Sequence, residues 1–344
     1  MDNDFSVFVG FDGFIDHIFA AVDQRFGPGN NFQKIKKIHQ FAERIANASG
    51  KSTNIELFPI EQRIGGNGPI LAQTIAFYGS QVQLMGALGT PLNAIFQRLS
   101  PKINPISIGN PGTTNAIEFE DGKLLLGVTY PLDHIKLENI LPYIQKNSEK
   151  IFACNAFCFT NWTMVVHLNE ILTFFWNHIQ EDRQKFCFFD LADPEKRSAN
   201  DIYNVLQLIQ LYSQKCTTIL GLNLKEAEQI AAVLQKRQLT ENVVNFKQYN
   251  IQELCQFIQA QTKIDEVLVH DIAHCAAATS SNVSYVDGFF VEHPKTTTGA
   301  GDHFNAGYLL AKLQKKSLHD CLFQAHRIAG HFVATGTCLR AARP

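Results

Sequence analysis

The chain has 344 residues, of which 45% are hydrophobic and 18% charged, and its formal net charge is -2. These proportions are typical of an ordered globular protein and exclude a disordered chain. The Lys and Arg residues are scattered and densest in KIKK at 34–37, so nothing indicates a nucleic-acid partner.

The N-terminus and the cysteines bear on location. MDNDFSVFVGFDGF lacks the basic segment of a secretory signal, and no apolar run reaches the length of a membrane span. The eight cysteines include no C-x-x-C pair, so buried free thiols are expected rather than a metal site. We therefore expect a cytoplasmic protein without a membrane partner.

The first third of the chain predicts strands, helices and a hairpin. FSVFVGFDGFID at 5–16 predicts a buried strand that ends in a turn, and residues 32–47 carry apolar residues at helical spacing. Residues 63–89 predict a glycine turn, a helix and a strand. The Asp121-Gly122 pair within 116–128 predicts a hairpin.

Strand–helix units then repeat along the chain. The apolar runs KIFACNAFCF, KFCFFDLA and CTTILGLN are each followed by a helical pattern. After DEVLVH, the alanines at 276–278 indicate a small helix, and VSYVDGFFVEHP at 283–294 predicts two strands around an Asp-Gly turn. A final helix is expected at about 318–335. Alternating units predict an α/β fold with a mostly parallel central sheet and helices on both faces.

The stretch TTTGAGD at 296–302 joins predicted strands to a helix. Without side chains at Gly299 and Gly301, backbone N–H groups can converge on an anion at the helix N-terminus. An aspartate there would repel the anion, unless Asp302 takes a proton from a group that attacks it. The pattern favours phosphoryl transfer. The alternative is a tight turn in which Thr298 or Asp302 caps the helix.

Four stretches together resemble the ribokinase-like family of sugar and nucleoside kinases, the PfkB group. They are VGFDGFID, GGNGPILA at 65–72, NLKE at 223–226 and, most specifically, TTGAGDHFNAG at 297–307. Their order and spacing hold from about residue 7 to 336. The resemblance implies a single ribokinase-like α/β domain over 1–344, with a small β-sheet lid built from about 104–132 and part of 17–62.

The resemblance implies the catalytic residues. Asp302 would be the general base that takes the proton of the acceptor hydroxyl. The amides of Gly299, Ala300 and Gly301 would hold the charge on the transferred phosphoryl group.

It also implies how the acceptor is bound. Asp16 would accept hydrogen bonds from substrate hydroxyls, and Asp12 either does the same or stabilises a turn. Gly65 and Gly66 would let the backbone approach the substrate, with Asn67 as a polar contact. These glycines also suit a tight turn before a helix.

On the donor side the resemblance implies ATP, with ADP as an alternative, and Mg²⁺. Glu226 and Asn223 would orient a hydrated Mg²⁺, although the same residues also suit a helix start with a capping box. His270, at the start of a loop that lacks the glycines of relatives, and Thr298 are candidates for the nucleotide. His326 lies near the expected adenine site, but a helix histidine is also often a core residue.

Other departures concern the acceptor and the metal. Phe14 and Ile70 stand where relatives carry polar contacts, which predicts an acceptor surface less hydroxylated than ribose or a shifted pose. Asp190 and Asp193, at the end of a strand, are expected to cap the next helix rather than to hold Mg²⁺.

Taken together, these residues predict a magnesium-dependent kinase that transfers the terminal phosphoryl group of a nucleotide to a hydroxyl of a sugar-like small molecule. The alternatives are a nucleoside kinase and a non-catalytic sugar- or nucleotide-binding relative. A dinucleotide-dependent oxidoreductase is disfavoured because GFDGFID lacks the G-x-G-x-x-G spacing. A homodimer through the lid is expected, as in several relatives.

Overall fold

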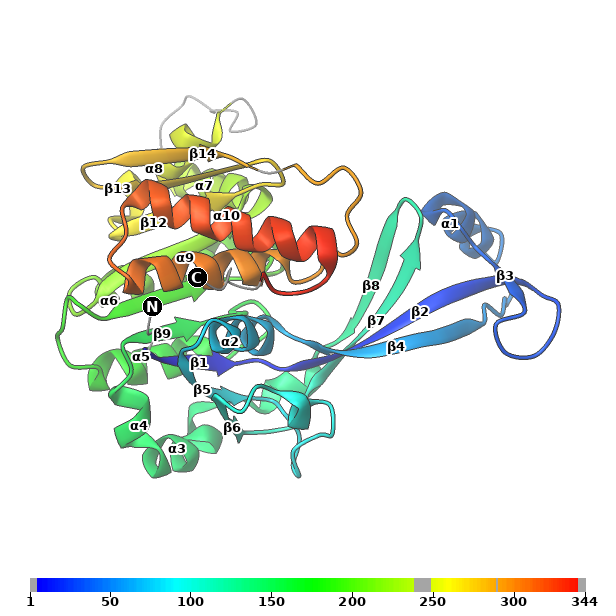
Figure 1. Ribbon diagram of the computed structural model, residues 1–344, viewed down its shortest axis with the longest axis horizontal. Coiled ribbons are helices and arrows are strands. Elements are labelled where there is room, and N and C mark those ends of the chain that lie inside the picture. Colours follow the sequence, from blue (N-terminus) through cyan, green and yellow to red (C-terminus); the bar gives the residue numbers. More distant parts are fainter. Residues whose placement is uncertain (1–4, 238–248, 289, 340–344) are drawn as a thin grey trace.

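The computed structural model describes residues 5–237, 249–288 and 290–339, which form two sheets of unequal size (Figure 1). The large sheet has the order β14-β13-β12-β11-β10-β9-β1-β5-β6. From β6 to β12 neighbouring strands run parallel, and β13 and β14 are antiparallel to their neighbours. This arrangement confirms the α/β class. The strands are β1 Ser6–Phe11, β5 Gln81–Gly86, β6 Ile103–Ser107, β9 Ala156–Phe159, β10 Phe186–Asp190, β11 Thr217–Asn223, β12 Glu266–His270, β13 His274–Thr279 and β14 Val283–Asp287.

Helices cover both faces of the large sheet because alternate strand residues are apolar on each side. Val7 and Val9 of β1 pack in one core with α2, α9 and α10, whereas Phe8 packs in the other with α3 to α8. The helices are α2 Asn67–Phe77, η1 Phe96–Arg98, η2 Tyr130–His134, α3 Leu137–Lys146, α4 Ser148–Phe152, α5 Leu168–His178, η3 Pro194–Lys196, α6 Ala199–Tyr212, α7 Leu224–Arg237, α8 Ile251–Thr262, α9 Ala300–Leu313 and α10 Leu318–Thr335. None of the described helices is long and apolar enough to cross a membrane.

The small sheet, hereafter the lid, projects from the large one (Figure 1). Its central strand β2 pairs with β3 and β4 antiparallel and with β7 parallel, and β7 pairs with β8. The helix α1 covers one face through Phe41, which packs on Ala21 and Ile117. Of the segment 104–132 expected in the lid, β6 lies in the large sheet. The lid elements are β2 Phe14–Arg25, β3 Phe32–Lys34, α1 Ile38–Ala46, β4 Leu57–Gly65, β7 Gly112–Phe119 and β8 Gly122–Val128.

Three local predictions are wrong. The helix predicted over 32–47 starts only at Ile38, because β3 precedes it. The alanines at 276–278 lie in the strand β13, where Ala276 and Ala278 pack in one core and Ala277 in the other. Burial on both faces thus overrides their helix propensity. Beyond β14 the described residues 290–299 form no second strand.

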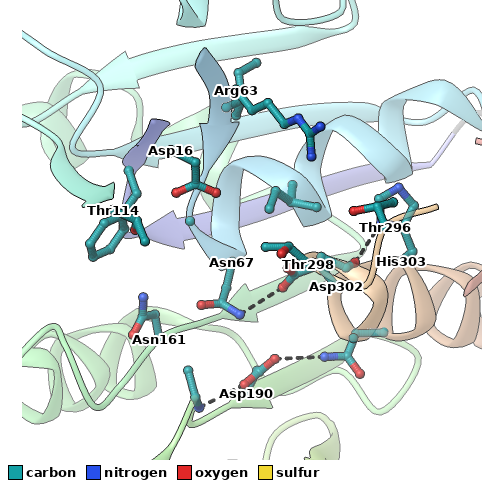
Figure 2. A pocket seen from close by; sticks show the side chains of 18 of the residues that line it. Asp16, Arg63, Asn67, Thr114, Asn161, Asp190, Thr296, Thr298, Asp302 and His303 are labelled. Carbon is teal, nitrogen blue, oxygen red and sulfur yellow. Dashed lines mark hydrogen bonds between the residues drawn. The ribbon is translucent and has the colours of Figure 1, made fainter. Parts of the chain in front are cut away.

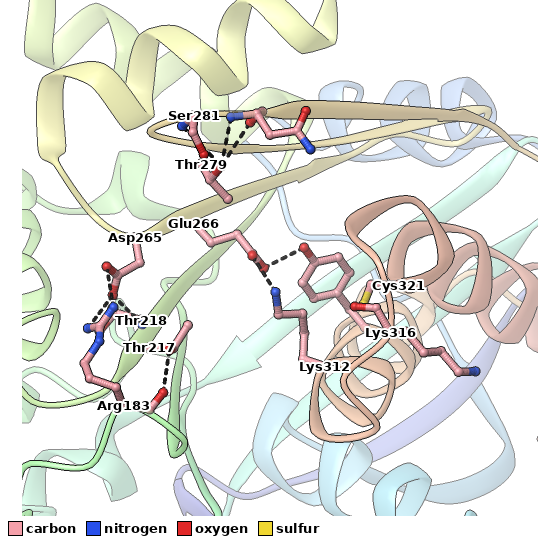
Figure 3. Close-up of polar contacts among 12 residues, drawn as sticks. Arg183, Thr217, Thr218, Asp265, Glu266, Thr279, Ser281, Lys312, Lys316 and Cys321 are labelled. Carbon is pink, nitrogen blue, oxygen red and sulfur yellow. Dashed lines mark hydrogen bonds and ion pairs between the residues drawn. The ribbon is translucent and has the colours of Figure 1, made fainter.

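Buried polar contacts fix the position of α9 (Figure 3). Glu266, at the start of β12, accepts hydrogen bonds from the Tyr308 hydroxyl at 2.6 Å and from Lys312 Nζ at 2.7 Å. The neighbouring Asp265 forms a separate and more exposed pair with Arg183 at 2.9 Å. A buried ion pair needs such complete partners to be tolerated. These contacts hold the helix whose first turn carries the predicted catalytic residues.

Candidate active site between the lid and the strand ends

A cleft of about 910 Å³ lies between the lid and the carboxyl ends of the central strands. Ligands of parallel sheets bind at this edge. Most of the predicted site residues line it: Asp16, Gly66, Asn67, Asn223, Glu226, His270, Thr298, Gly299, Gly301 and Asp302. Four predicted residues lie outside its lining: Asp12, Gly65, Ala300 and His326.

The glycine loop begins α9 as the sequence predicts. Gly299 is the N-cap with φ 85, a left-handed conformation that favours glycine, and Ala300 is the first helical residue. The first N–H groups of a helix have no partner within it and suit an anion. A Cβ at Gly301 would lie 3.5 Å from His270 Cε1, an ordinary contact, so the space alone does not require a glycine at this position.

Asp302 lies in the first turn of α9, with 6% of its surface exposed. Asn67 Nδ2 donates to its Oδ1 at 3.0 Å (Figure 2). Burial first, and then repulsion from Asp190, raise the pKa of Asp302 well above its usual value. A carboxylate with a raised pKa is a stronger base, which suits removal of a hydroxyl proton.

Asp16 comes from the lid and faces the same cleft (Figure 2). It pairs across the sheet with Arg63 of β4 and Thr114 of β7, so these three side chains form one row on the cleft side. Burial raises the pKa of Asp16, while a hydrogen bond from Thr114 and the positive charge of Lys123 oppose the shift. The carboxylate is therefore placed to accept hydrogen bonds from a bound hydroxyl compound.

Asp12 is fully buried below the cleft. Its carboxylate accepts hydrogen bonds from the backbone N–H groups of Asn67 at 2.9 Å and Gly68 at 2.8 Å. It also accepts from Asn161 Nδ2 at 2.9 Å and from the Thr160 hydroxyl at 3.2 Å. These contacts are structural, but they hold the N-terminus of α2 rather than the turn that was the expected alternative.

The glycine pair before α2 makes room for the two acidic side chains. A Cβ at Gly65 would stand 2.2 Å from Asp16 Oδ1, and one at Gly66 would stand 2.9 Å from Asp12 Oδ2. Gly66 also has φ 91, which disfavours other residues. Gly65 therefore leaves room for Asp16, and Gly66 leaves room for Asp12.

Asn223 and Glu226 form the capping box that was the structural alternative. Asn223 Oδ1 accepts from the Glu226 N–H at 3.0 Å, and Glu226 Oε2 accepts from the Asn223 N–H at 2.9 Å. Glu226 Oε1 also accepts from the Asp193 N–H at 2.7 Å. Both residues nevertheless line the cleft, so the cap and a role in the site are compatible.

Asp190 does not cap a helix, so that prediction is wrong. Ser198 caps α6, whereas Asp190 lines the cleft and accepts from Asn305 Nδ2 at 2.8 Å (Figure 2). Asp193 stands at the start of η3 without a side-chain cap and pairs with Lys196 at 3.0 Å. Their positions at and just after the end of β10 did not predict that these two carboxylates have different partners.

The acidic side of the cleft fits a hydrated cation. Burial, and then repulsion from Glu226, raise the pKa of Asp190 to about 8, and burial raises the pKa of Glu226 as well. Two buried carboxyl groups that repel each other are stabilised by a positive charge between them. Among the described residues no three His, Cys, Asp or Glu side chains converge as direct metal ligands. The residues therefore fit Mg²⁺ that keeps its water ligands.

His270 begins a tight turn between β12 and β13, in which the Asp271 N–H donates to the His274 carbonyl at 2.8 Å. Its ring lies 4.7 Å from that of Phe304, and burial lowers the pKa of His270 to about 4. The imidazole is consequently neutral at pH 7. The short turn offers no glycine loop for donor phosphates.

His326 lies in α10 as a core residue. Its Nε2 would be 1.3 Å from a Cβ at Gly288, so the ring packs directly on that glycine and outside the cleft lining. The surroundings of His326 are therefore those of a core residue, which was the alternative to a place near the adenine.

Four residues that line the cleft were missed from the sequence: Arg63, Asn161, His303 and Asn305. Lys123 was also missed, and it contacts the cleft residue Thr298. Asn161 follows β9, so a strand-end rule would have found it. His303 Nδ1 donates to the Gly299 carbonyl at 2.8 Å and the ring stacks on Phe332, which supports the glycine loop. Arg63 and Lys123 reach the site through the lid, and no local pattern marks them.

Comparisons with known proteins agree with this geometry. The profile of the prokaryotic ketohexokinase family matches residues 2–341. A ketohexokinase from Haloferax volcanii is 23% identical over 339 residues, which cover 96% of this chain and 87% of the relative.

Solved structures of low sequence identity share the fold. The nucleoside kinase of Methanocaldococcus jannaschii, an archaeal member of the ribokinase family, has a TM-score of 0.61 at 13% identity, covering 98% of this chain and 93% of that one. The ribokinase of Cryptococcus neoformans in complex with ADP has a TM-score of 0.63 at 15% identity, covering 97% and 95%. The fold is therefore ribokinase-like, as predicted.

Proposed function

The chain belongs to the prokaryotic ketohexokinase family, and from this we propose that it transfers the terminal phosphoryl group of ATP to a hydroxyl of a ketohexose. It is a carbohydrate kinase, a phosphotransferase with an alcohol group as acceptor. The proposal rests above all on one observation. A buried carboxyl group of raised pKa, Asp302, lies at the start of a glycine-capped helix and faces the same cleft as Asp16.

In the proposed reaction the acceptor binds under the lid. Asp16 accepts hydrogen bonds from its hydroxyls, while the apolar Phe14 and Ile70 contact less polar parts of the sugar. Asn67 holds the Asp302 carboxylate through the bond to Oδ1 at 3.0 Å, which leaves Oδ2 to take the proton of the reacting hydroxyl. Asp302 takes the hydroxyl proton as the new O–P bond forms and the bond to the leaving ADP breaks.

The N–H groups of Gly299 and Gly301, which line the cleft at the start of α9, face the negative charge of the phosphoryl group in transfer, whereas the Ala300 N–H donates to the Thr297 carbonyl at 3.3 Å. Preorganised donors of this kind contribute on the order of 3 kcal/mol each. Mg²⁺, held through water near Asp190 and Glu226, would supply positive charge to the donor phosphates.

The experiment is the transfer of labelled terminal phosphate from Mg-ATP and, separately, from Mg-ADP to fructose, ribose and adenosine. We expect transfer from ATP to fructose by the wild type and none by Asp302→Asn. Transfer to adenosine or ribose in preference to fructose would replace the ketohexose as acceptor, and transfer from ADP would replace the donor. Equal transfer by the Asp302→Asn protein would remove the general base from the mechanism.

We also propose that the lid forms a homodimer with a second copy of the chain. The strand β8 is an edge of the lid, and its Leu126 and Val128 are 46% and 40% exposed. Such an edge tends to pair with another chain. Sedimentation should show a dimer for the wild type and a monomer for Leu126→Glu combined with Val128→Glu. A monomeric wild type would overturn the proposal.

A further inference from the structure

Lys123 joins the lid to the loop that precedes the anion site. It lies at the start of β8, and its Nζ donates to the Thr297 hydroxyl at 3.0 Å and to the Thr298 hydroxyl. Thr298 directly precedes Gly299, the N-cap of α9. The ammonium group of a lid residue is therefore held next to the amides that suit a phosphoryl group.

The environment of Lys123 is unusual for a lysine on a hairpin. Its side chain is partly buried, which lowers its pKa, whereas Glu118 and Asp16 favour its charged form. In the described part of the chain it takes part in no ion pair within 4.0 Å. By contrast Lys36, elsewhere on the lid, pairs with Glu120 at 3.6 Å. Two neutral hydroxyls do not neutralise a charge that is shielded from water.

The other groups nearby do not supply the missing anion. Arg63 of the lid lines the cleft, and it already pairs with Glu61. Asp16 lowers the energy of the charged lysine from a distance but makes no bond with it. The turn at His270 carries no phosphate-binding glycine, so the donor phosphates lack a contact that a longer loop would give.

We propose that Lys123 binds the terminal phosphoryl group of the donor, so that the lid closes fully only over a nucleotide that carries the group to be transferred. This assignment rests on the proposed kinase function. Without nucleotide the ammonium is held by the Thr297 and Thr298 hydroxyls. With nucleotide it moves to the phosphoryl oxygens and stays there as the charge passes to the acceptor.

The test compares three variants by isothermal titration with ATP and with ADP, without acceptor. Lys123→Gln keeps a hydrogen-bond donor for the threonines but removes the charge, Lys123→Arg keeps the charge, and Lys36→Met is the matched control on the lid. We expect Lys123→Gln to weaken ATP binding about tenfold, the effect of one charge-assisted hydrogen bond, with ADP binding changed less than about twofold. Lys123→Arg should recover most of the ATP affinity, and Lys36→Met should match the wild type.

Steady-state rates with the accepted sugar give a second readout. Lys123→Gln should lower kcat about tenfold or more and leave the KM of the sugar within about threefold. If Lys123→Gln lost equal affinity for ATP and ADP, or kept its kcat, Lys123 would only connect the lid to the Thr297–Thr298 loop, and the proposal would be wrong. A wild type that transfers no phosphate would instead overturn the proposed function, and the ATP-to-ADP contrast would still decide whether Lys123 binds the terminal phosphate. Melting curves, with Lys123→Met as a further variant, separate these effects from unfolding.

Discussion

The large sheet and the lid place their functional groups on very different supports. In β11 and β12 nearly every residue is buried between two layers of helices, whereas β4 exposes five consecutive residues, 59–63, and β8 exposes 125–128. Segments with few buried contacts open at lower free energy than core strands. The base and the anion loop thus stand on the rigid part, while Asp16 and Lys123 stand on the part best able to move.

This difference predicts separate kinetic effects on the two sides. Asp302→Asn should lower kcat by a factor of about 10³, because general-base catalysis contributes typically 10²–10⁴. Asp16→Asn should instead raise the KM of the sugar by about tenfold to a hundredfold, the effect of a lost charged hydrogen bond. Initial rates over both substrates measure these effects. A large loss of kcat with unchanged KM in Asp16→Asn would contradict the separation of sugar binding on the lid from catalysis on the large sheet.

A smaller change tests whether the lid carboxylate depends on the glycine beside it. In Gly65→Ala the new methyl group would overlap Asp16 Oδ1, which lies 2.2 Å from its position, so the carboxylate must shift. The KM of the sugar should rise about tenfold while ATP affinity stays within about twofold. The matched control is Gly127→Ala on the same cleft wall, where an added Cβ meets only a methyl group at 3.8 Å. Equal effects in the two variants would contradict the role of Gly65.

The smallest expected effect is on stability and concerns the rigid side. The pKa of Asp190 is raised from 3.8 to about 8, so its contribution to folding is fully present below pH 3.8 and is lost as the pH rises through 8. Asp190→Asn should therefore raise Tm relative to the wild type by at least about 2 °C at pH 9 and by less at pH 5. Thermal unfolding without Mg²⁺ at both pH values measures this. A Tm difference independent of pH would contradict the raised pKa of Asp190.

The rigid side was also easier to predict from the sequence than the lid. The glycine loop, Asp302 and the order of strand–helix units are local patterns, so spacing alone locates them. Lys123 acts 174 residues away from Thr297, and such a contact depends on how the lid folds back over the sheet. The alanines of β13 were misjudged for a related reason. Their propensity is helical, but helices on both faces of the strand leave room only for small side chains.

Asp190 and Asp193 illustrate a limit of local patterns within the core itself. Asp190 is the last residue of β10 and Asp193 follows it, and both suited a cap by residue type. Only the fold decides that Asp190 accepts from Asn305 while Asp193, which also lines the cleft, pairs with Lys196. Conversely, Asn223 and Glu226 form the capping box that the sequence predicts and also line the cleft. A residue pattern that explains a helix cap therefore does not exclude a place in the site.

The saturated carboxylate of Asp12 has a practical consequence for protein engineering. Asp12 fastens the start of α2, and Asn67 at that start holds Asp302, so an error at Asp12 reaches the base through one intermediate residue. A mutational scan scored by turnover alone would rank Asp12 with the catalytic groups, although it lines no part of the cleft. Libraries intended to change sugar preference should therefore vary Phe14 and Ile70 and leave Asp12 fixed. Measuring soluble yield together with turnover would identify residues that, like Asp12, act through the structure rather than in catalysis.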